Sequence, residues 1–360
     1  MIRPPDYVLG IQPYVPGKPI EELERELGIS NSVKLASNEN PVGPSPAALK
    51  AIVTVSADLN RYPDGAGFYL KKALSEKLGV SDEEIILGNG SNELLDLAAK
   101  TFMKDGDEAV MATPSFVVYF MAVQGIGGKS VQVPLKDHRH DLAAMAEAIT
   151  PSTKIVFIAN PNNPTGTMNG KEEFDRFMER VPESVLVVVD EAYFEYVSDP
   201  GYADSMKYLH QKKDLLILRT FSKIYGLAGL RIGYGIAKKE LLSDMNRLRE
   251  PFNTNSIGQK AAIAALSDTD HVARSRKVNE EGKEYLYREI GALGLAFVPT
   301  QANFIYMPVE GPMALYENLL KLGVIIRPMG PKAVRVTIGL PEENRRFIEA
   351  LKAVTGAGRR

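Results

Sequence analysis

Two cations stand out in the stretch "TFSKIYGLAGLRIGY" (220–234), where Lys223 and Arg231 are separated by residues that carry no charge. Lys223 follows an apolar run, "LLILRTF" (215–221). A lysine at the end of a buried strand is desolvated, which lowers the pKa of its amine and makes it a usable nucleophile. Glycines between the two cations let the backbone approach a ligand closely. The stretch therefore predicts a reactive amine and a guanidinium that face one ligand.

A carboxylate ends a second apolar run, "VLVVVDEAY" (185–193), in which Asp190 follows five apolar residues. A buried charge needs a partner, so this position favours a functional role. The alternative is that Asp190 caps the start of a helix.

Two further segments follow apolar runs with polar residues. "GNGSNELLDLAA" (88–99) places glycines, Ser91 and Asn92 at the start of a predicted helix, where free N–H groups and the positive end of the helix dipole bind phosphate. "ANPNNPTG" (159–166) places amides and prolines after a strand, and its alternative reading is a plain turn.

One ligand explains all four segments, namely an aldehyde cofactor that carries a phosphate and a ring nitrogen in need of a proton. Lys223 would condense with the aldehyde, Asp190 would hold the ring nitrogen protonated, and Arg231 with the helix N–H groups would bind the phosphate. That ligand is pyridoxal 5′-phosphate.

With these motifs the chain resembles the fold-type I aminotransferases, whose signature S-K-x3-L-A-G-x-R-x-G matches residues 222–233. The resemblance implies that Lys223 is the Schiff-base lysine, that Asp190 pairs with the pyridine nitrogen, and that Asn163 and Tyr193 hydrogen-bond the ring's phenolic oxygen. It implies that Phe116, in "TPSFVVY", stacks on the ring. It also implies that the phosphate is surrounded by Gly90, Ser91, Asn92, Thr220, Ser222 and Arg231, and by Tyr62 of a neighbouring subunit, which would make the active unit a homodimer.

Within this family, "LASNENPVGPSP" (35–46), "RYPDG" (61–65) and "VRVTIG" (334–339) most resemble the histidinol-phosphate aminotransferases. This resemblance implies transamination between L-histidinol phosphate and 2-oxoglutarate or glutamate, in histidine biosynthesis. Arg335 would grip the anionic group of the substrate. Auxiliary contacts would come from Tyr14, Asn303 and Arg327, although a surface ion pair is the alternative for Arg327.

Other functions remain open at this point. An aromatic amino-acid aminotransferase and a threonine-phosphate decarboxylase would both use the same cofactor motifs. A transcription regulator with an aminotransferase-like domain is a non-enzymatic alternative, but such chains carry a DNA-binding domain before "LASNEN", and only about 30 residues precede it here.

The composition fits a small-molecule enzyme. The net charge is −2 and no run of Lys or Arg predicts nucleic-acid binding. The absence of cysteine excludes a disulfide framework, a thiolate metal site and a cysteine nucleophile. "HRH" (138–140) has no further ligand at metal-binding spacing, so we expect no metal site. We expect a cytoplasmic protein, because neither a secretory signal nor a membrane-spanning stretch is found.

The elements that must position these residues follow an α/β pattern. Predicted strands cover 84–87, 108–112, 130–134, 154–160, 185–192, 215–221 and 232–237, and helices such as 91–103 and 171–180 separate them. This predicts a mainly parallel seven-stranded sheet, with functional groups past the carboxyl ends of its strands. From about residue 245 the pattern changes to a long helical tract (258–290) and a smaller α+β region. We therefore predict a large cofactor-binding domain over 32–245, with 1–31 and 246–360 forming an N-terminal arm and a small domain.

Overall fold

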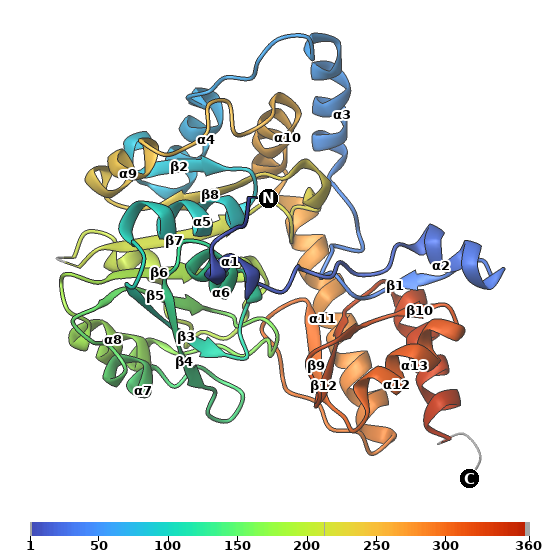
Figure 1. Ribbon diagram of the computed structural model, residues 1–360. Helices are drawn as coiled ribbons and strands as arrows, with labels where there is room; N and C mark the ends of the chain where they lie inside the picture. The colour runs from blue at the N-terminus through green and yellow to red at the C-terminus, as the bar shows by residue number, and fades with distance from the viewer. Residues whose placement is uncertain (1, 212, 357–360) are drawn as a thin grey trace.

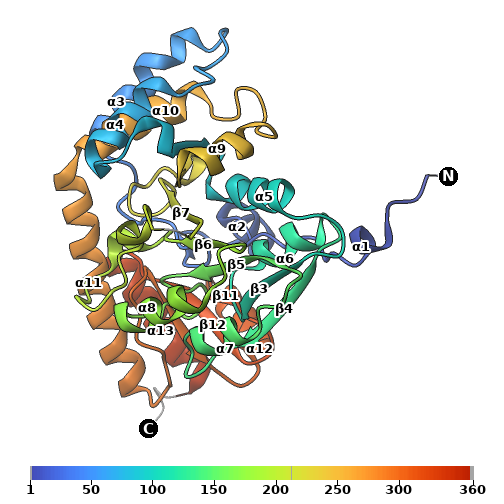
Figure 2. The ribbon, with the colours of Figure 1, turned by 90° about the vertical axis from the view of Figure 1, so that its left-hand side faces the viewer.

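The computed structural model describes residues 2–211 and 213–356, and its centre is a seven-stranded sheet covered by helices on both faces (Figures 1 and 2). The strand order is β2-β8-β7-β6-β5-β3-β4. The strands are β2 (Ile85–Gly88), β3 (Glu108–Thr113), β4 (Lys129–Pro134), β5 (Thr153–Ala159), β6 (Leu186–Asp190), β7 (Leu215–Thr220) and β8 (Gly233–Ile236). Each predicted strand is present, with ends that differ by at most two residues from the prediction.

The sheet is mainly parallel, as predicted. Only β8 runs against its neighbours, since it pairs antiparallel with both β2 and β7. The remaining pairs, β3–β4, β3–β5, β5–β6 and β6–β7, are parallel. Strands β6 and β7 are buried along their whole length, which explains why their sequences read as unbroken apolar runs.

Helices bury their apolar sides against the two faces of the sheet. One face is covered by α3 (Pro46–Val55), α4 (Phe68–Leu78), α7 (Leu142–Glu147), α8 (Lys171–Arg180) and α10 (Ser256–Ser267). The other face is covered by α5 (Ser91–Phe102), α6 (Val117–Gln124) and α9 (Lys239–Asn246). The predicted helix 171–180 has the predicted ends, and 91–103 ends one residue earlier.

A smaller unit follows near the C-terminus. Its antiparallel sheet has the order β11-β12-β9, formed by β11 (Arg327–Pro328), β12 (Ala333–Thr337) and β9 (Phe304–Pro308). A two-stranded parallel pair joins β1 (Val33–Lys34) to β10 (Val324–Ile325). Helices α12 (Pro312–Lys321) and α13 (Pro341–Thr355) pack on this unit around a separate apolar core.

The predicted helical tract 258–290 is helical, and it is divided into two helices at Asp268. The carboxylate of Asp268 accepts a hydrogen bond from the backbone N–H of His271 and so caps the start of α11 (Thr269–Ala292). Helix α11 runs from the large sheet to the small unit (Figure 1). Its early residue Val272 packs on the large core, and Leu286 and Ile290 belong to the small one.

The N-terminal residues contact both parts of the molecule. The backbone carbonyl of Tyr7, in α1 (Asp6–Leu9), accepts a hydrogen bond from Gln124 of α6. Leu23, in α2 (Ile20–Leu27), packs against Ile325 of the small unit. The division into domains at residues 32 and 245 stays a prediction.

Among the described residues, no helix has both the length and the apolar character needed to cross a membrane.

Candidate active site

Six strands, β2 to β7, point their carboxyl ends in the same direction, and the polar segments of the sequence follow four of them, β2, β5, β6 and β7. A cavity of about 200 Å³ lies there. It is lined by Tyr14, Ser37, Asn38, Ser91, Asn92, Phe116, Tyr119, Ala159, Pro161, Asn163, Asp190, Ala192, Tyr193, Thr220, Ser222, Lys223, Arg231 and Arg335. Most residues singled out from the sequence are thus brought together by the common direction of these strands.

The Lys223 amine lies three residues past the end of β7, inside this cavity. Its Nζ donates a hydrogen bond to the backbone carbonyl of Ser37 at 3.4 Å and lies 5.5 Å from the centre of the Tyr193 ring. Burial lowers the pKa of Lys223 to about 8, and the positive charges of Arg335 and Arg231 act in the same direction. Close to neutral pH a usable fraction of this amine is therefore uncharged.

The Asp190 carboxylate ends β6 and is almost fully buried, with 6% of the residue exposed. It does not cap a helix. Its Oδ2 accepts a hydrogen bond from the Tyr119 hydroxyl at 2.8 Å, and its Oδ1 accepts one from the Ala192 N–H at 3.1 Å. Burial raises the pKa of Asp190, although the bond from Tyr119 acts against this shift. Asp190 lines the cavity, and each carboxylate oxygen can accept a further hydrogen bond, so a cationic group bound there could pair with it.

Tyr119 was not found by sequence analysis. It lies in α6, three residues after Phe116, and the two rings meet edge to face with centroids 5.6 Å apart. Its ring is fully buried and stacks on Phe157 at 5.0 Å. In the sequence it is one aromatic residue of an apolar helix, and nothing distinguishes it from ordinary core.

A buried arginine lines the same cavity as the lysine. Arg335, in β12, donates to the side-chain oxygen of Asn163 at 2.6 Å and to the backbone carbonyl of Ala36 at 2.7 Å. Its Nε is buried and has no hydrogen-bond partner among the described residues. Burial lowers the pKa of Arg335, but an arginine stays charged at any physiological pH. This guanidinium is suited to an anion that enters the cavity.

The start of α5 and Arg231 form a second place for an anion. Gly90 has φ of 74°, and a Cβ there would meet the Nη2 atom of Arg231 at 2.4 Å. Arg231 donates from Nη1 to the Ser222 hydroxyl at 3.3 Å. The Ser222 N–H in turn donates to Thr220 Oγ1 at 3.1 Å. Hydroxyls, a guanidinium and the first N–H groups of a helix together match the needs of a phosphate.

The substitution Gly90→Ala is expected to weaken binding of the cofactor phosphate by on the order of tenfold or more. The added methyl group would displace the Arg231 guanidinium, and alanine is strained at the positive φ of this position. Titration of the purified variant with pyridoxal phosphate, and with pyridoxal lacking the phosphate, measures this. The loss should be confined to the phosphorylated form. Gly79→Ala, at a helix C-cap with φ of 69° and open space around its Cβ, is a control for a methyl group in a positive-φ conformation away from the cavity.

Four predicted residues do not line this cavity. Gly90 lies behind Arg231, as described above. The Arg327 guanidinium donates to the Val15 carbonyl at 2.7 Å and lies 5.3 Å from the centre of the Tyr14 ring, so it borders the cavity through Tyr14. Asn303 is buried and donates to the backbone carbonyl of Asn38 at 3.1 Å. Tyr62 is 82% exposed and stacks on Phe252 with ring centroids 4.7 Å apart.

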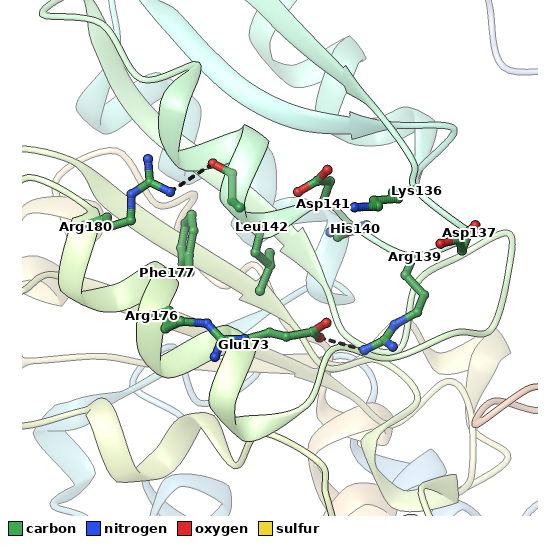
Figure 3. Close-up of a pocket in the computed structure, with 11 residues that line it drawn as sticks. Lys136, Asp137, Arg139, His140, Asp141, Leu142, Glu173, Arg176, Phe177 and Arg180 are labelled. Atoms are coloured by element: carbon green, nitrogen blue, oxygen red, sulfur yellow. Dashed lines mark hydrogen bonds and ion pairs between the residues drawn. The ribbon is translucent and has the colours of Figure 1, made fainter.

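A second cavity, of about 390 Å³, lies between the loop at 135–141 and helices α7 and α8 (Figure 3). Arg139 donates to the Glu173 carboxylate at 2.6 Å, and Arg180 donates to the Ala143 carbonyl at 3.5 Å, as the dashed lines show. None of the residues predicted from the motifs lines this cavity. The smaller cavity at the strand ends is therefore the candidate active site.

The residues of the candidate active site fit pyridoxal phosphate. An amine of lowered pKa, a buried carboxylate and a cradle of phosphate-binding groups are what its aldehyde, ring nitrogen and phosphate require. The phosphate-binding groups lie close together because two neighbouring residues are glycines. A side chain at Gly90 would collide with Arg231, and one at Gly233 would collide with the Ser91 N–H.

Comparison with known proteins agrees with this geometry. The family model described as aminotransferase class I and II matches residues 30–351. The histidinol-phosphate aminotransferase of Moorella thermoacetica is 52% identical over 96% of this chain and 92% of its own length. Histidinol-phosphate aminotransferase 1 of Nitrosococcus oceani is 51% identical over 96% of this chain and 95% of its own.

A solved structure of the same kind of enzyme is also similar to this chain. The crystal structure of histidinol-phosphate aminotransferase from Sinorhizobium meliloti, in complex with pyridoxal 5′-phosphate, is 30% identical to this chain. The two structures align over 99% of this chain and 98% of the Sinorhizobium chain, with a TM-score of 0.91. With motifs, fold and relatives in agreement, the chain belongs to the class I and II aminotransferases, and among them to the histidinol-phosphate aminotransferases.

Proposed function

We propose that this protein transfers the amino group of L-histidinol phosphate to 2-oxoglutarate, giving imidazole-acetol phosphate and L-glutamate, as a step of histidine biosynthesis in the cytoplasm. The observation that carries the proposal is the buried Arg335 guanidinium, which shares one cavity with the Lys223 amine. Both substrates present an anionic group, a phosphate in one and a carboxylate in the other. Both would have to use the same cation in turn.

The cofactor, when bound, supplies an aldehyde that condenses with amines and a ring that accepts the electron pair released at the substrate's α-carbon. Lys223 would hold the cofactor through its amine between turnovers. Once the amino group of the substrate took its place, the freed lysine would be a neutral amine beside the reacting atoms. That amine would take the proton from the substrate's α-carbon and return it to the carbon that was the cofactor's aldehyde, so Lys223 would act first as base and then as acid.

Asp190 holds the ring nitrogen in its protonated form. Its carboxylate is buried, and the bonds from Tyr119 and Ala192 keep it oriented toward the cavity. Tyr193 and Asn163 hydrogen-bond the phenolic oxygen of the ring, and Phe116 packs on the ring's face. Ser91, Asn92, Thr220, Ser222 and Arg231 bind the phosphate, with Gly90 allowing their close approach.

Arg335 binds the anionic group of the substrate. Its bond to Asn163 links substrate binding to the group that contacts the ring. Tyr14 is in the cavity wall, and Arg327 lies over its ring and adds a second positive charge at the border of the cavity. Two arginines suit a dianionic phosphate better than one would.

The substrate proposal is tested by steady-state assays in which L-histidinol phosphate and L-phenylalanine compete as amino donors, with glutamate formation as the readout. We expect a higher kcat/KM for histidinol phosphate. A higher value for phenylalanine would favour the aromatic aminotransferase. Release of carbon dioxide from threonine phosphate would favour the decarboxylase.

Cofactor capture should depend on pH through Lys223. Only the neutral amine attacks an aldehyde, so the rate rises with pH as the amine loses its proton, with a midpoint near its pKa of about 8. At pH 7 about a tenth of the amine is already neutral, against far less than a hundredth for an ordinary lysine. Stopped-flow absorbance after mixing apoenzyme with pyridoxal phosphate measures this. A midpoint above pH 10 would contradict it.

We further propose a homodimer in which Tyr62 reaches the cofactor phosphate of the partner's site. Its exposure, together with the nearby exposed Phe68, Tyr69 and Phe252, supports an apolar contact surface around α4. Two variants that each lack one of these residues, Tyr62→Ala and Lys223→Ala, test this when mixed and refolded together. One site of the hybrid would regain both residues and therefore its activity. A hybrid without activity would show that Tyr62 does not act across the interface.

A further inference from the structure

The segment between β1 and α3 runs through the cavity wall and carries a buried asparagine, Asn38, that none of the motifs assigned. The residue is 1% exposed, and its φ of 56° lies in the left-handed region. Asn38 Nδ2 donates a hydrogen bond to the Tyr193 hydroxyl oxygen at 2.8 Å. A buried side chain held in this uncommon backbone conformation indicates that the surrounding contacts fix its position.

The contacts of Thr337 determine which way the Asn38 amide points. Thr337 Oγ1 accepts a hydrogen bond from the Asn38 backbone N–H at 3.0 Å. Its own proton is therefore free to be donated to Asn38 Oδ1, which lies at 3.3 Å. With the amide oxygen paired to Thr337, the amide nitrogen must face Tyr193.

This orientation restricts the Tyr193 proton. Because the amide nitrogen is a donor only, the Tyr193 oxygen accepts the bond from Asn38, and its own O–H must be donated in another direction. The ring is held edge to face against Phe304 at 5.1 Å, and Tyr193 lines the cavity. The hydroxyl proton is thus available to a ligand group inside the cavity.

We propose that Asn38 is a positioning residue that directs the Tyr193 hydroxyl proton toward the phenolic oxygen of the cofactor and couples this bond to the small unit. The inference rests on the proposed function, since it uses the role given there to Tyr193. The coupling comes from β12, through Thr337, and from Asn303, whose Nδ2 donates to the Asn38 carbonyl at 3.1 Å. Asn303 therefore supports Asn38 rather than lining the substrate cavity.

The test uses the pH midpoint at which the visible absorbance of the lysine-bound cofactor changes. A hydrogen bond to the phenolic oxygen stabilises its negative charge and so favours the deprotonated form, which lowers this midpoint. Asn38→Gly should raise the midpoint by about half a unit to one unit, because the donor is lost while glycine accepts the left-handed backbone. Asn38→Asp, which keeps the shape but cannot donate, should raise it at least as far.

A double-mutant cycle separates positioning from general damage. Tyr193→Phe alone should raise the midpoint, and adding Asn38→Gly to it should change the midpoint no further, since no hydroxyl proton remains to be directed. Asn40→Ala is the matched control. Asn40 lies two residues away, is buried, and donates to the Ile224 carbonyl at 2.7 Å and the Ser275 hydroxyl at 2.9 Å, so its loss lowers stability without moving the midpoint.

The outcomes are distinguishable. An Asn38→Gly midpoint equal to that of the unaltered chain, or an equal shift in Asn40→Ala, overturns this inference alone. An unaltered chain that binds pyridoxal phosphate without a visible absorbance change overturns the proposed function and this inference with it. If Asn38→Gly fails to fold, Asn38→Asp provides the same comparison, with thermal unfolding of the cofactor-free protein as the check on folding.

Discussion

The Lys223→Ala variant is expected to lose transamination by on the order of 10⁴-fold or more, the largest effect of any single substitution in this chain. The reason is that one amine both attaches the cofactor and moves the proton at the substrate's α-carbon. Among the residues that the structure describes, no other lysine lines the cavity. The purified variant should also lack the visible absorbance of lysine-bound cofactor, while still binding pyridoxal phosphate through the contacts to its phosphate.

Lys171→Ala is the matched control for this experiment. Lys171 is an exposed residue of α8 that pairs with Asp175, and its removal should leave turnover and absorbance unchanged. Retention of the visible band in Lys223→Ala, with turnover within tenfold of the unaltered chain, would refute the role given to this lysine.

The second large effect is expected for Asp190→Asn, which should lower kcat/KM by about 10²- to 10⁴-fold. Asparagine keeps the shape of the side chain but removes the charge that holds the ring nitrogen protonated. The visible band should persist because Lys223 is intact. Steady-state kinetics together with the absorbance spectrum separate this effect from loss of the cofactor.

Two further variants test whether the effect comes from the charge at position 190. Tyr119→Phe removes only the bond to Asp190 Oδ2, so its effect should be near tenfold. Asp244→Asn changes an exposed carboxylate of α9 and should have no effect. An Asp190→Asn enzyme as active as Tyr119→Phe would mean that the charge at position 190 is not needed.

The large sheet and the cofactor motifs were predictable from sequence for a local reason. Strands that are buried on both faces are mostly apolar, so the apolar runs in "VLVVVD" and "LLILRT" predict the two strands. The polar residues after each run predict where the strand ends. The polar residue after each strand must then lie at the common carboxyl edge. Lys223, Asp190 and the start of α5 were found in this way, without knowledge of any long-range contact.

The division between α10 and α11 shows a limit of the same reasoning. The tract 258–290 keeps helical periodicity throughout, and only the φ and ψ angles of Asp268 and its cap on His271 interrupt it. Both helices must pack against different parts of the molecule, and that requirement is not written in the local pattern.

By itself the sequence determined the sheet, the order of its strands along the chain, and the positions of the amine, the carboxylate and the groups proposed to bind phosphate, because each depends on residues close together in the chain. Only the tertiary structure decided which side chains orient them. Tyr119 reaches Asp190 from 71 residues away, and Asn38 reaches Tyr193 from 155. Such pairs join separate elements that meet only when the sheet, its helices and the small unit have packed, so no local pattern in the chain encodes them.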